Sequence, residues 1–252
     1  MSKIGKVDVA ILTKNSERLL RECLTSIYEN IPVNRLIVVD GYSTDSTLNI
    51  LEEFQQRHGN IKIIRVGGTR GYARQIAVDH VETEWFMFVD SDVILCKNWF
   101  KKAARFIRED VGAVWGMEIW STLTSNRRLL GFFMKANMKV FNQRGGTHDI
   151  LIRKKAIEGI RIPSYLHTYE DAYIKDWIFK KGFKVIATFD PYCVHYRPEE
   201  VWTLHESIKL AANDLPHAAK RPPLFLAYAF FTAIVARQML LNRKRNERLK
   251  VV

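Results

Sequence analysis

The chain has 252 residues, of which 47% are hydrophobic, so it can bury the core of one large domain, alone or with an appendage. Its formal net charge of +12 indicates an anionic partner: nucleic acid, anionic lipid or a phosphorylated substrate. The sequence has no zinc-finger spacing and no RNA-binding signature, so we do not expect nucleic acid to be that partner.

The first half of the sequence alternates short apolar segments with helical patterns. Strands are predicted at 7–13, 35–40, 61–66 and 85–90. Helices are predicted around 16–28, 48–54, 72–80 and 98–107. This alternation indicates an α/β fold with a mostly parallel sheet covered by helices on both faces.

The second half is less regular. A strand is predicted at 111–120, and a long helical segment follows it up to Phe141. The segment 144–160 combines a glycine loop, a short apolar strand and a helix. A helix with Gly182 near its C-terminus leads to a strand through Phe189, and the chain is expected to be helical after Pro198.

Polar side chains follow three of the predicted strands. They are Thr13 and Asn15, then Asp40, then Asp90 and Asp92. Because ligands of such sheets bind at the carboxyl ends of the strands, this convergence predicts a site, although solvated loop residues are the alternative. Two carboxylates at the mouth of a buried strand repel each other, so we expect a positive group between them.

Five segments occur in a recognisable order: VDVAILTKNSE, LIVVDGYSTDST, GYARQIAV, FVDSDV and YEDAYIKDWIFKKGFKV. Together they resemble the family 2 glycosyltransferases over roughly residues 7–197. The resemblance implies the GT-A fold, which is Rossmann-like. It also implies transfer of a sugar from a UDP or GDP donor to an acceptor hydroxyl or a lipid-linked acceptor, with inversion at the anomeric carbon.

The resemblance also implies roles on the nucleotide side. Asp40 takes the place of an acid that contacts the nucleotide base. The other positions that match nucleotide-binding motifs are Thr13, Asn15, Glu17, Gly71, Ala73 and Arg74. Arg74 is also a candidate for facing phosphate. Gly41, Leu12 and Gln75 depart from the family pattern, so the identity of the base stays open.

The Asp90-Ser91-Asp92 segment resembles the metal-binding motif of the family. A divalent cation neutralises a departing diphosphate, and hard oxygen ligands suit Mn²⁺ or Mg²⁺. We expect Asp92 to bind the metal directly, and Asp90 to contact the ribose or to reach the metal through water, with Ser91 on the nucleotide. His195 is a candidate metal or diphosphate ligand, and a structural histidine is the alternative.

An inverting transfer needs a base that takes the proton of the acceptor. Glu170-Asp171 matches an acidic pair of the family at a helix start, and we assign Asp171 as the base and Glu170 as its support. The alternative is that both acids only complement the helix dipole. His148 lies in the acceptor-side loop of the pattern, and Trp177 near the acceptor, but packing roles are favoured for both.

Two other functions are alternatives to sugar transfer. A nucleotidyltransferase also uses paired acids and a metal, but Lys14 lies in a segment without the glycine-rich phosphate loop that such an enzyme needs. A non-catalytic protein that binds sugar nucleotides or nucleic acid would bind donor without turning it over.

The C-terminal segment has an apolar stretch between basic flanks. Residues 224–236 carry no charge, and as a helix they would span about 20 Å, short of the ~30 Å hydrocarbon core. We expect this helix to lie at a membrane surface, with packing on the domain or in a homodimer as the alternative. We divide the chain into a catalytic domain, 1–200, and a helical extension, 201–252.

We expect the protein in the cytoplasm, peripheral to the membrane. The N-terminal residues lack the apolar core of a signal peptide. The three cysteines, Cys23, Cys96 and Cys193, are odd in number and have no metal-ligand spacing, as expected of reduced thiols.

Overall fold

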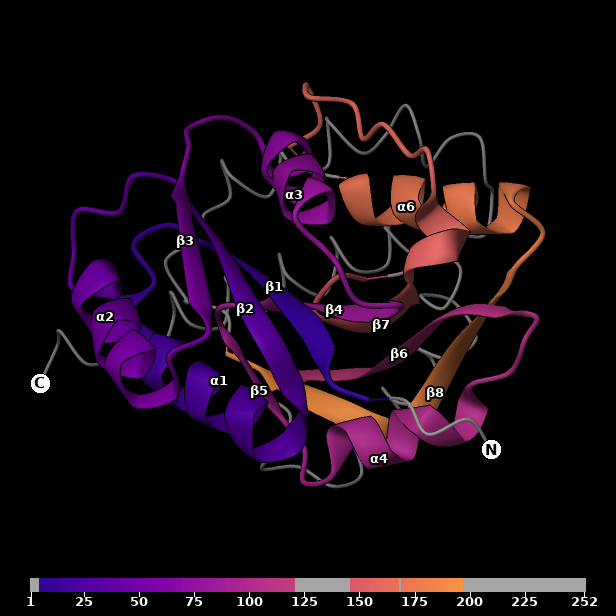
Figure 1. The fold of residues 1–252 in the computed structure, drawn as a ribbon, viewed down its shortest axis with the longest axis horizontal. Helices are drawn as coiled ribbons and strands as arrows, with labels where there is room; N and C mark the ends of the chain where they lie inside the picture. The colour runs from indigo at the N-terminus through magenta and orange to yellow at the C-terminus, as the bar shows by residue number, and fades with distance from the viewer. Residues whose placement is uncertain (1–4, 121–145, 168, 197–252) are drawn as a thin grey trace, which may run out of the picture.

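The computed structural model describes residues 5–120, 146–167 and 169–196. They form an eight-stranded sheet with helices on both faces, which confirms the predicted α/β class (Figure 1). The strands are β1 (Val7–Thr13), β2 (Val33–Asp40), β3 (Ile61–Arg65), β4 (Trp85–Asp90), β5 (Val93–Leu95), β6 (Val111–Trp120), β7 (Asp149–Arg153) and β8 (Lys184–His195). Their order across the sheet is β3-β2-β1-β4-β7-β6-β8-β5.

The sheet changes character halfway across. Strands β3, β2, β1 and β4 are parallel neighbours, as the regular first half of the sequence predicts. Strand β7 then runs antiparallel to both β4 and β6, while β8 is parallel to β6 and antiparallel to β5. The second half is less regular because its strands are joined by mixed pairings rather than by repeated strand–helix units.

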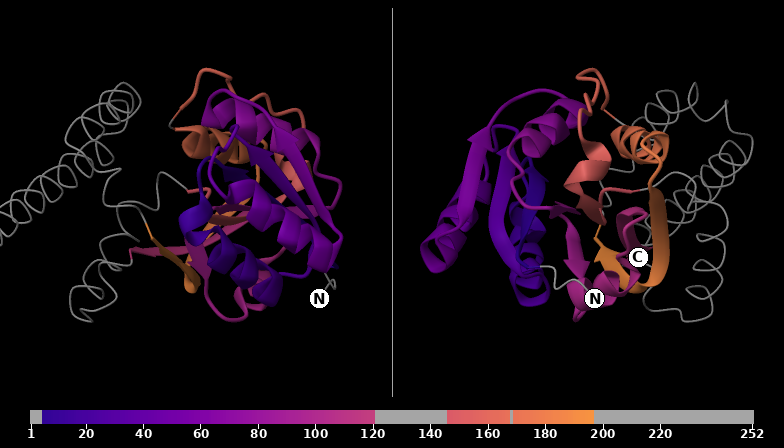
Figure 2. Two further views of the ribbon diagram at one scale, coloured as in Figure 1. Left: turned by 90° about the vertical axis from the view of Figure 1, so that its left-hand side faces the viewer. Right: turned by 45° about the vertical axis from the view of Figure 1, so that its right-hand side comes forward.

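The helices cover the two faces of the sheet (Figures 1 and 2), and the sheet lies between two apolar clusters. Helices α1 (Glu17–Asn30), α2 (Thr47–His58) and α4 (Trp99–Ala103) contribute to one apolar cluster, and α3 (Arg70–Asp79) and α6 (Glu170–Lys180) to the other. Successive residues of β1 alternate between the clusters, since Val9 and Ile11 belong to the first and Ala10 to the second. The expectation of helices on both faces is therefore confirmed.

Several predicted elements differ in length from the observed ones. The helix expected at 98–107 is only five residues long as α4, followed by a 3₁₀ turn at Ala104–Phe106. The helix expected after β7 is a 3₁₀ turn, Lys154–Ile157. Strand β8 continues to His195, beyond the predicted end at Phe189, and this extension pairs with β5, which was not predicted.

Three expectations lie outside the described residues: the helical segment up to Phe141, the helices after Pro198 and the domain division at residue 200. Among the helices of the described ranges, none combines the length and the apolar character needed to cross a bilayer.

Candidate active site

The strand-end polar residues meet at one edge of the sheet. In the parallel register, Thr13 of β1 lies beside Asp40 of β2, and Leu12 lies beside Asp90 of β4. Thr13 donates a hydrogen bond to Asp40 over 3.0 Å. The convergence inferred from the sequence is therefore present as a physical cluster at the carboxyl ends of β1, β2 and β4.

The loops that follow β1 and β2 are bonded to each other. The backbone N–H of Asn15 donates to the Ser43 hydroxyl at 2.9 Å, and the Asn15 side-chain oxygen accepts from the N–H of Thr44 at 2.9 Å. Glu17 accepts from the N–H of Ser46 at 2.8 Å. Asn15 and Glu17, both predicted to bind nucleotide, thus also hold the two loops in one fixed arrangement.

Asp40 is fully buried, and its oxygens are engaged by the protein. One oxygen accepts from Thr13 and from the Ser43 hydroxyl, at 2.5 Å for the latter. The other accepts from the N–H of Ser43 at 2.9 Å and lies 3.4 Å from Nε of Arg65. Since a carboxylate offers about four acceptor positions, Asp40 is saturated in this arrangement.

Tyr42 is a large exposed side chain of the same loop, with 57% of its surface accessible. Its backbone has a φ of 58°, which is rare for a bulky residue, and the Arg65 guanidinium lies 5.4 Å from its ring centre. Tyr42 of this loop and Arg65 at the end of β3 therefore lie together, and the buried Asp40 contacts Arg65.

Arg74 joins α3 to the acidic motif. Its side chain is almost completely buried, and Nη2 donates to Asp90 at 2.6 Å and to Thr147 at 2.7 Å. Burial opposes ionisation of Asp90, but the positive charges of Arg74 and His195 prevail and hold the pKa of Asp90 below its usual value. Nε and Nη1 of Arg74 have no hydrogen-bond partner among the described residues.

Gly71, predicted beside the nucleotide, has a clear packing role. Its N–H donates to the Leu166 carbonyl at 2.8 Å, and an added Cβ would lie 2.6 Å from the Pro163 carbonyl. Only glycine lets the start of α3 approach this loop so closely. Gly71 thereby fixes the helix that carries Arg74.

Asp92 and His195 form the second half of the acidic cluster. The pairing of β5 with β8 places His195 opposite Val93, so its Nε2 lies 2.9 Å from Asp92 Oδ1. Ligand atoms of Asp90, Asp92 and His195 all lie within 4.8 Å of one another. Two carboxylates and one imidazole at this spacing fit a divalent cation such as Mn²⁺.

Ser91 lies between these acids and faces the loop after β1. Its hydroxyl is 3.0 Å from the hydroxyl of Ser16, the residue directly before α1. Ser16 makes no side-chain capping bond to α1, so its hydroxyl is used instead to join this loop to the acidic motif.

Glu118 of β6 was not predicted as a site residue. Its Oε1 lies 2.7 Å from Nδ1 of His195, and its Oε2 lies 4.0 Å from Nε2 of His148. The signal in the sequence was a lone carboxylate in the apolar segment VGAVWGMEIW, since a buried acid needs a partner. That partner is far away in the chain, so the sequence did not identify it.

His148 belongs to a second buried cluster with Asp149 and Cys193. Its Nδ1 lies 2.5 Å from Asp149 Oδ1 and 3.6 Å from the Cys193 sulfur, and Trp99 donates to the other Asp149 oxygen at 2.7 Å. Burial raises the pKa of the Cys193 thiol well above its usual value. This hydrogen-bonded cluster favours the packing role for His148.

Glu170 and Asp171 start α6, as predicted. Glu170 is buried, whereas Asp171 is partly exposed. Burial and the negative charge of Asp171 raise the pKa of Glu170 to about 7, against the attraction of Arg74 and Arg70. Arg74 thus interacts electrostatically with Glu170 as well as with Asp90. Trp177, further along α6, is packed against the core, as the packing alternative expects.

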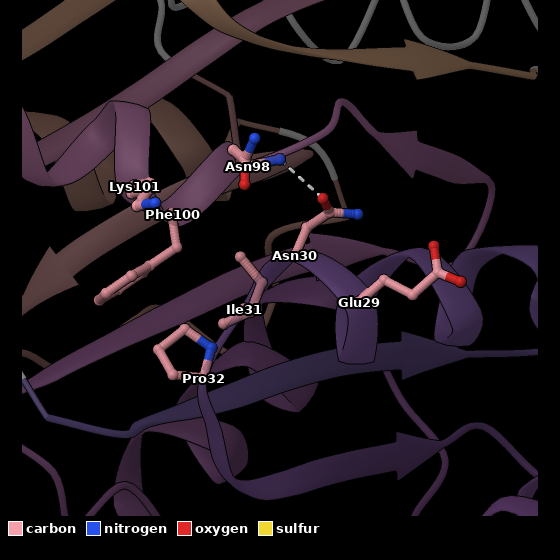
Figure 3. A pocket seen from close by; sticks show the side chains of 7 residues that line it. All are labelled: Glu29, Asn30, Ile31, Pro32, Asn98, Phe100 and Lys101. Atoms are coloured by element: carbon pink, nitrogen blue, oxygen red, sulfur yellow. Dashed lines mark hydrogen bonds between the residues drawn. The ribbon is translucent and has the colours of Figure 1, made fainter.

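A pocket of about 370 Å³ lies elsewhere, between the end of α1 and the start of α4 (Figure 3). It is at the amino end of β2, whereas the acids lie at the carboxyl ends of the strands. Asn30 and Asn98 are hydrogen-bonded at its wall, and the pocket holds no acid pair or histidine. It therefore has none of the chemistry of the strand-end cluster.

The family model described as Glycosyl transferase family 2 matches residues 8–159. Among curated proteins, the poly(ribitol-phosphate) beta-N-acetylglucosaminyltransferase TarS of Staphylococcus aureus is 36% identical over 110 residues. That match covers 41% of this chain but only 19% of the length of TarS.

Solved structures show the same fold. TarS residues 1–349 in complex with UDP-GlcNAc align with a TM-score of 0.62 at 22% identity, over 83% of this chain and 66% of that one. The mannosyltransferase PcManGT of Pyrobaculum calidifontis, in complex with GDP-Man and Mn²⁺, aligns with a TM-score of 0.67 at 19% identity, over 96% of this chain and 76% of that one.

Proposed function

The chain belongs to glycosyl transferase family 2, and on this premise we propose that it transfers a sugar from a nucleoside-diphosphate donor to an acceptor, with inversion. The observation that carries the proposal is the meeting of Asp90, Asp92 and His195 at the strand edge, with the unpaired nitrogens of Arg74 nearby. At such a site, a bound cation and the guanidinium of Arg74 would both contact a diphosphate.

Asp92 and His195 would hold Mn²⁺ or Mg²⁺. When bound, such an ion neutralises the charge that grows on a departing diphosphate. Asp90 is already bonded to Arg74, which favours contact with the ribose, or with the ion through water, over direct ligation. The nitrogens of Arg74 that lack a partner in the described ranges would bind a phosphate oxygen.

Asp171 would act as the general base. It is the more exposed of the two acids at the start of α6 and is therefore accessible to an acceptor hydroxyl. Glu170 is buried beneath it, within the field of Arg74 and Arg70. We assign Glu170 the supporting role of holding the helix start against α3.

The donor site would lie over the loops after β1 and β2. Thr13, Asn15 and Ser91 line this edge, and Tyr42 with Arg65 forms its outer wall. Asp40 would contact a base only by exchanging one of its present donors, so its main contribution is to fix this loop. The complexes of TarS with UDP-GlcNAc and of PcManGT with GDP-Man support a UDP or GDP donor.

The proposal for the acceptor rests on the sequence alone. The basic segment after residue 220 supports a lipid-linked or glycan acceptor used at the cytoplasmic face of a membrane, with 201–252 as a separate helical extension. A non-catalytic binding protein is the competing function. The raised pKa of Glu170 favours an enzyme, because paired acids with separated environments are typical of acid–base catalysis.

A donor screen tests the proposal. Thermal stabilisation and hydrolysis would be measured for UDP- and GDP-sugars, each with Mn²⁺ and with a chelator. We expect one nucleotide class to stabilise the protein only with Mn²⁺ and to be slowly hydrolysed. Stabilisation without any turnover, with or without candidate acceptors, would support the binding protein instead.

A further inference from the structure

Glu118 lies where an acid is costly to keep. Its neighbours in β6, Met117 and Ile119, are 5% and 7% exposed, and its own side chain is 16% exposed. A carboxylate in such surroundings is stable only with a charged or hydrogen-bonded partner. Its Oε1 lies 2.7 Å from Nδ1 of His195.

The sheet brings this pair together. Strands β6 and β8 are parallel, and their register places Glu118 beside Cys193, two residues before His195. Strand β5 binds the other edge of β8 and places His195 opposite Val93, next to Asp92. His195 is therefore held between a carboxylate on each side, with Nδ1 facing Glu118 and Nε2 facing Asp92 at 2.9 Å.

The two ring nitrogens consequently have different tasks. A carboxylate only accepts hydrogen bonds, so Glu118 keeps a proton on Nδ1. Asp92 faces Nε2 at 2.9 Å, so in the metal-free chain it accepts a second proton there, and a divalent cation bound at Asp92 would displace that proton and take its place beside Nε2. Metal-binding histidines generally donate their second N–H to a carboxylate in this way, which fixes the ring and its tautomer.

We propose that Glu118 is the positioning residue of the metal site: it fixes the tautomer and orientation of His195 so that Nε2, together with Asp92, binds the divalent cation. This inference rests on the proposed function of Asp92 and His195. It adds a residue from β6 and thereby makes the affinity for the ion depend on the pairing of β6 with β8.

The first test measures Mn²⁺ binding to the full chain without donor, with the EPR signal of free Mn²⁺ as the readout. Glu118→Leu removes the acceptor of the Nδ1 proton, so the ring would hold its proton on Nε2 beside Asp92, and we expect 10–100-fold weaker Mn²⁺ binding. Glu118→Gln keeps an acceptor oxygen without the charge, and its affinity should lie between Glu118→Leu and the unmodified chain.

Met117→Ala is the matched control. It removes a buried side chain from the same strand without touching His195, so it should lower stability and leave Mn²⁺ affinity unchanged. Equal loss of affinity in Met117→Ala and Glu118→Leu would overturn the proposal, because the effect would then come from general damage to β6.

The second readout needs no substitution. In ¹⁵N-histidine NMR spectra of the metal-free chain, His195 should carry a proton on Nδ1, and a His195 with an unprotonated Nδ1 would overturn the inference. Asp92→Ala and His195→Ala test the metal site separately from the role of Glu118. If both keep normal Mn²⁺ affinity, the metal site itself is wrong. If both lose it while Glu118→Leu binds normally, the metal site stands and Glu118 has no part in it.

Discussion

Glu170 and Asp171 are neighbours in the chain but have different surroundings. The first is buried near Arg74, and the second is partly exposed. The burial of Glu170 and the mutual repulsion of the two acids leave one acid that binds a proton near neutral pH and one that is partly exposed. This difference at the scale of single residues supports the assignment of Asp171 as base.

Asp171→Asn should therefore lower kcat by roughly 10²–10⁴-fold, the usual contribution of a general base. The substitution keeps the size of the side chain and removes its basicity, so donor affinity should stay within a few-fold. Glu170→Gln should cost less turnover. Steady-state kinetics with the donor found by the screen would check this, and a larger loss in Glu170→Gln than in Asp171→Asn would reverse the two roles.

The raised pKa of Glu170 also predicts a pH dependence of stability. Its pKa rises from 4.5 to about 7 on folding, so the folded state binds this proton more tightly than the unfolded state. The resulting stabilisation is present below about pH 4.5 and is lost as the pH rises toward 7, a change of at most about 3 kcal/mol.

Glu170→Gln should remove this dependence. The difference in free energy of unfolding, variant minus unmodified chain, should therefore increase from pH 5 to pH 8. Urea unfolding at both pH values measures the difference. Glu52→Gln, on the exposed side of α2, is the control. A constant difference for Glu170→Gln at both pH values would contradict the assigned shift.

At the scale of elements, β6 has a feature that the buried cluster requires. Gly116 lies at an irregularity in the pairing of β6 with β8, and an added Cβ would overlap the Asp149 carboxylate and approach the Pro191 carbonyl to 2.9 Å. The absence of a side chain at Gly116 thus makes room for Asp149, which bonds both Trp99 and His148.

Gly116→Ala should destabilise the fold by about 1–3 kcal/mol, the usual cost of overpacking a core. Gly5→Ala is the control, since nothing lies within 4 Å of a Cβ at that position, and its effect should stay within about 0.5 kcal/mol. Denaturant unfolding measures both. Equal stabilities for the two variants would show that the space beside Asp149 is not needed.

The sequence predicted the elements whose signals are local. Strands β1 to β4 are apolar segments followed by polar loops, and the acids Asp90 and Asp92 are separated only by Ser91 in the chain. Strand β5 was missed because its three residues are a strand only through pairing with β8, about 100 residues later. Glu118 was missed for the same reason, since its contact with His195 exists only in the folded sheet.

At the scale of the whole molecule, the charge of +12 is unevenly placed along the sequence. Arg243, Lys244 and Arg245 follow an apolar segment near the C-terminus, outside the described residues, and Lys220 and Arg221 precede it. An apolar helix with basic flanks is typical of segments that lie at anionic membrane surfaces.

Full-length protein should therefore float with anionic liposomes, and a chain ending at Arg221 should not. High salt should weaken flotation of the full-length protein without abolishing it, because salt screens the basic residues but not apolar insertion. Liposome flotation with quantification of bound protein measures this. Equal flotation of both chains, or none of either, would argue decisively against membrane attachment through this segment.

The proposed dependence of sugar transfer on a divalent cation held at Asp92 and His195 can be measured directly. Its most direct test is the rate of Asp92→Ala with the identified donor at buffered Mn²⁺ concentrations. A bound metal contributes several kcal/mol, so the rate should fall by at least about 100-fold and lose its dependence on Mn²⁺. A variant that keeps a near-normal, Mn²⁺-dependent rate would contradict the claim, because the ion would then be held elsewhere.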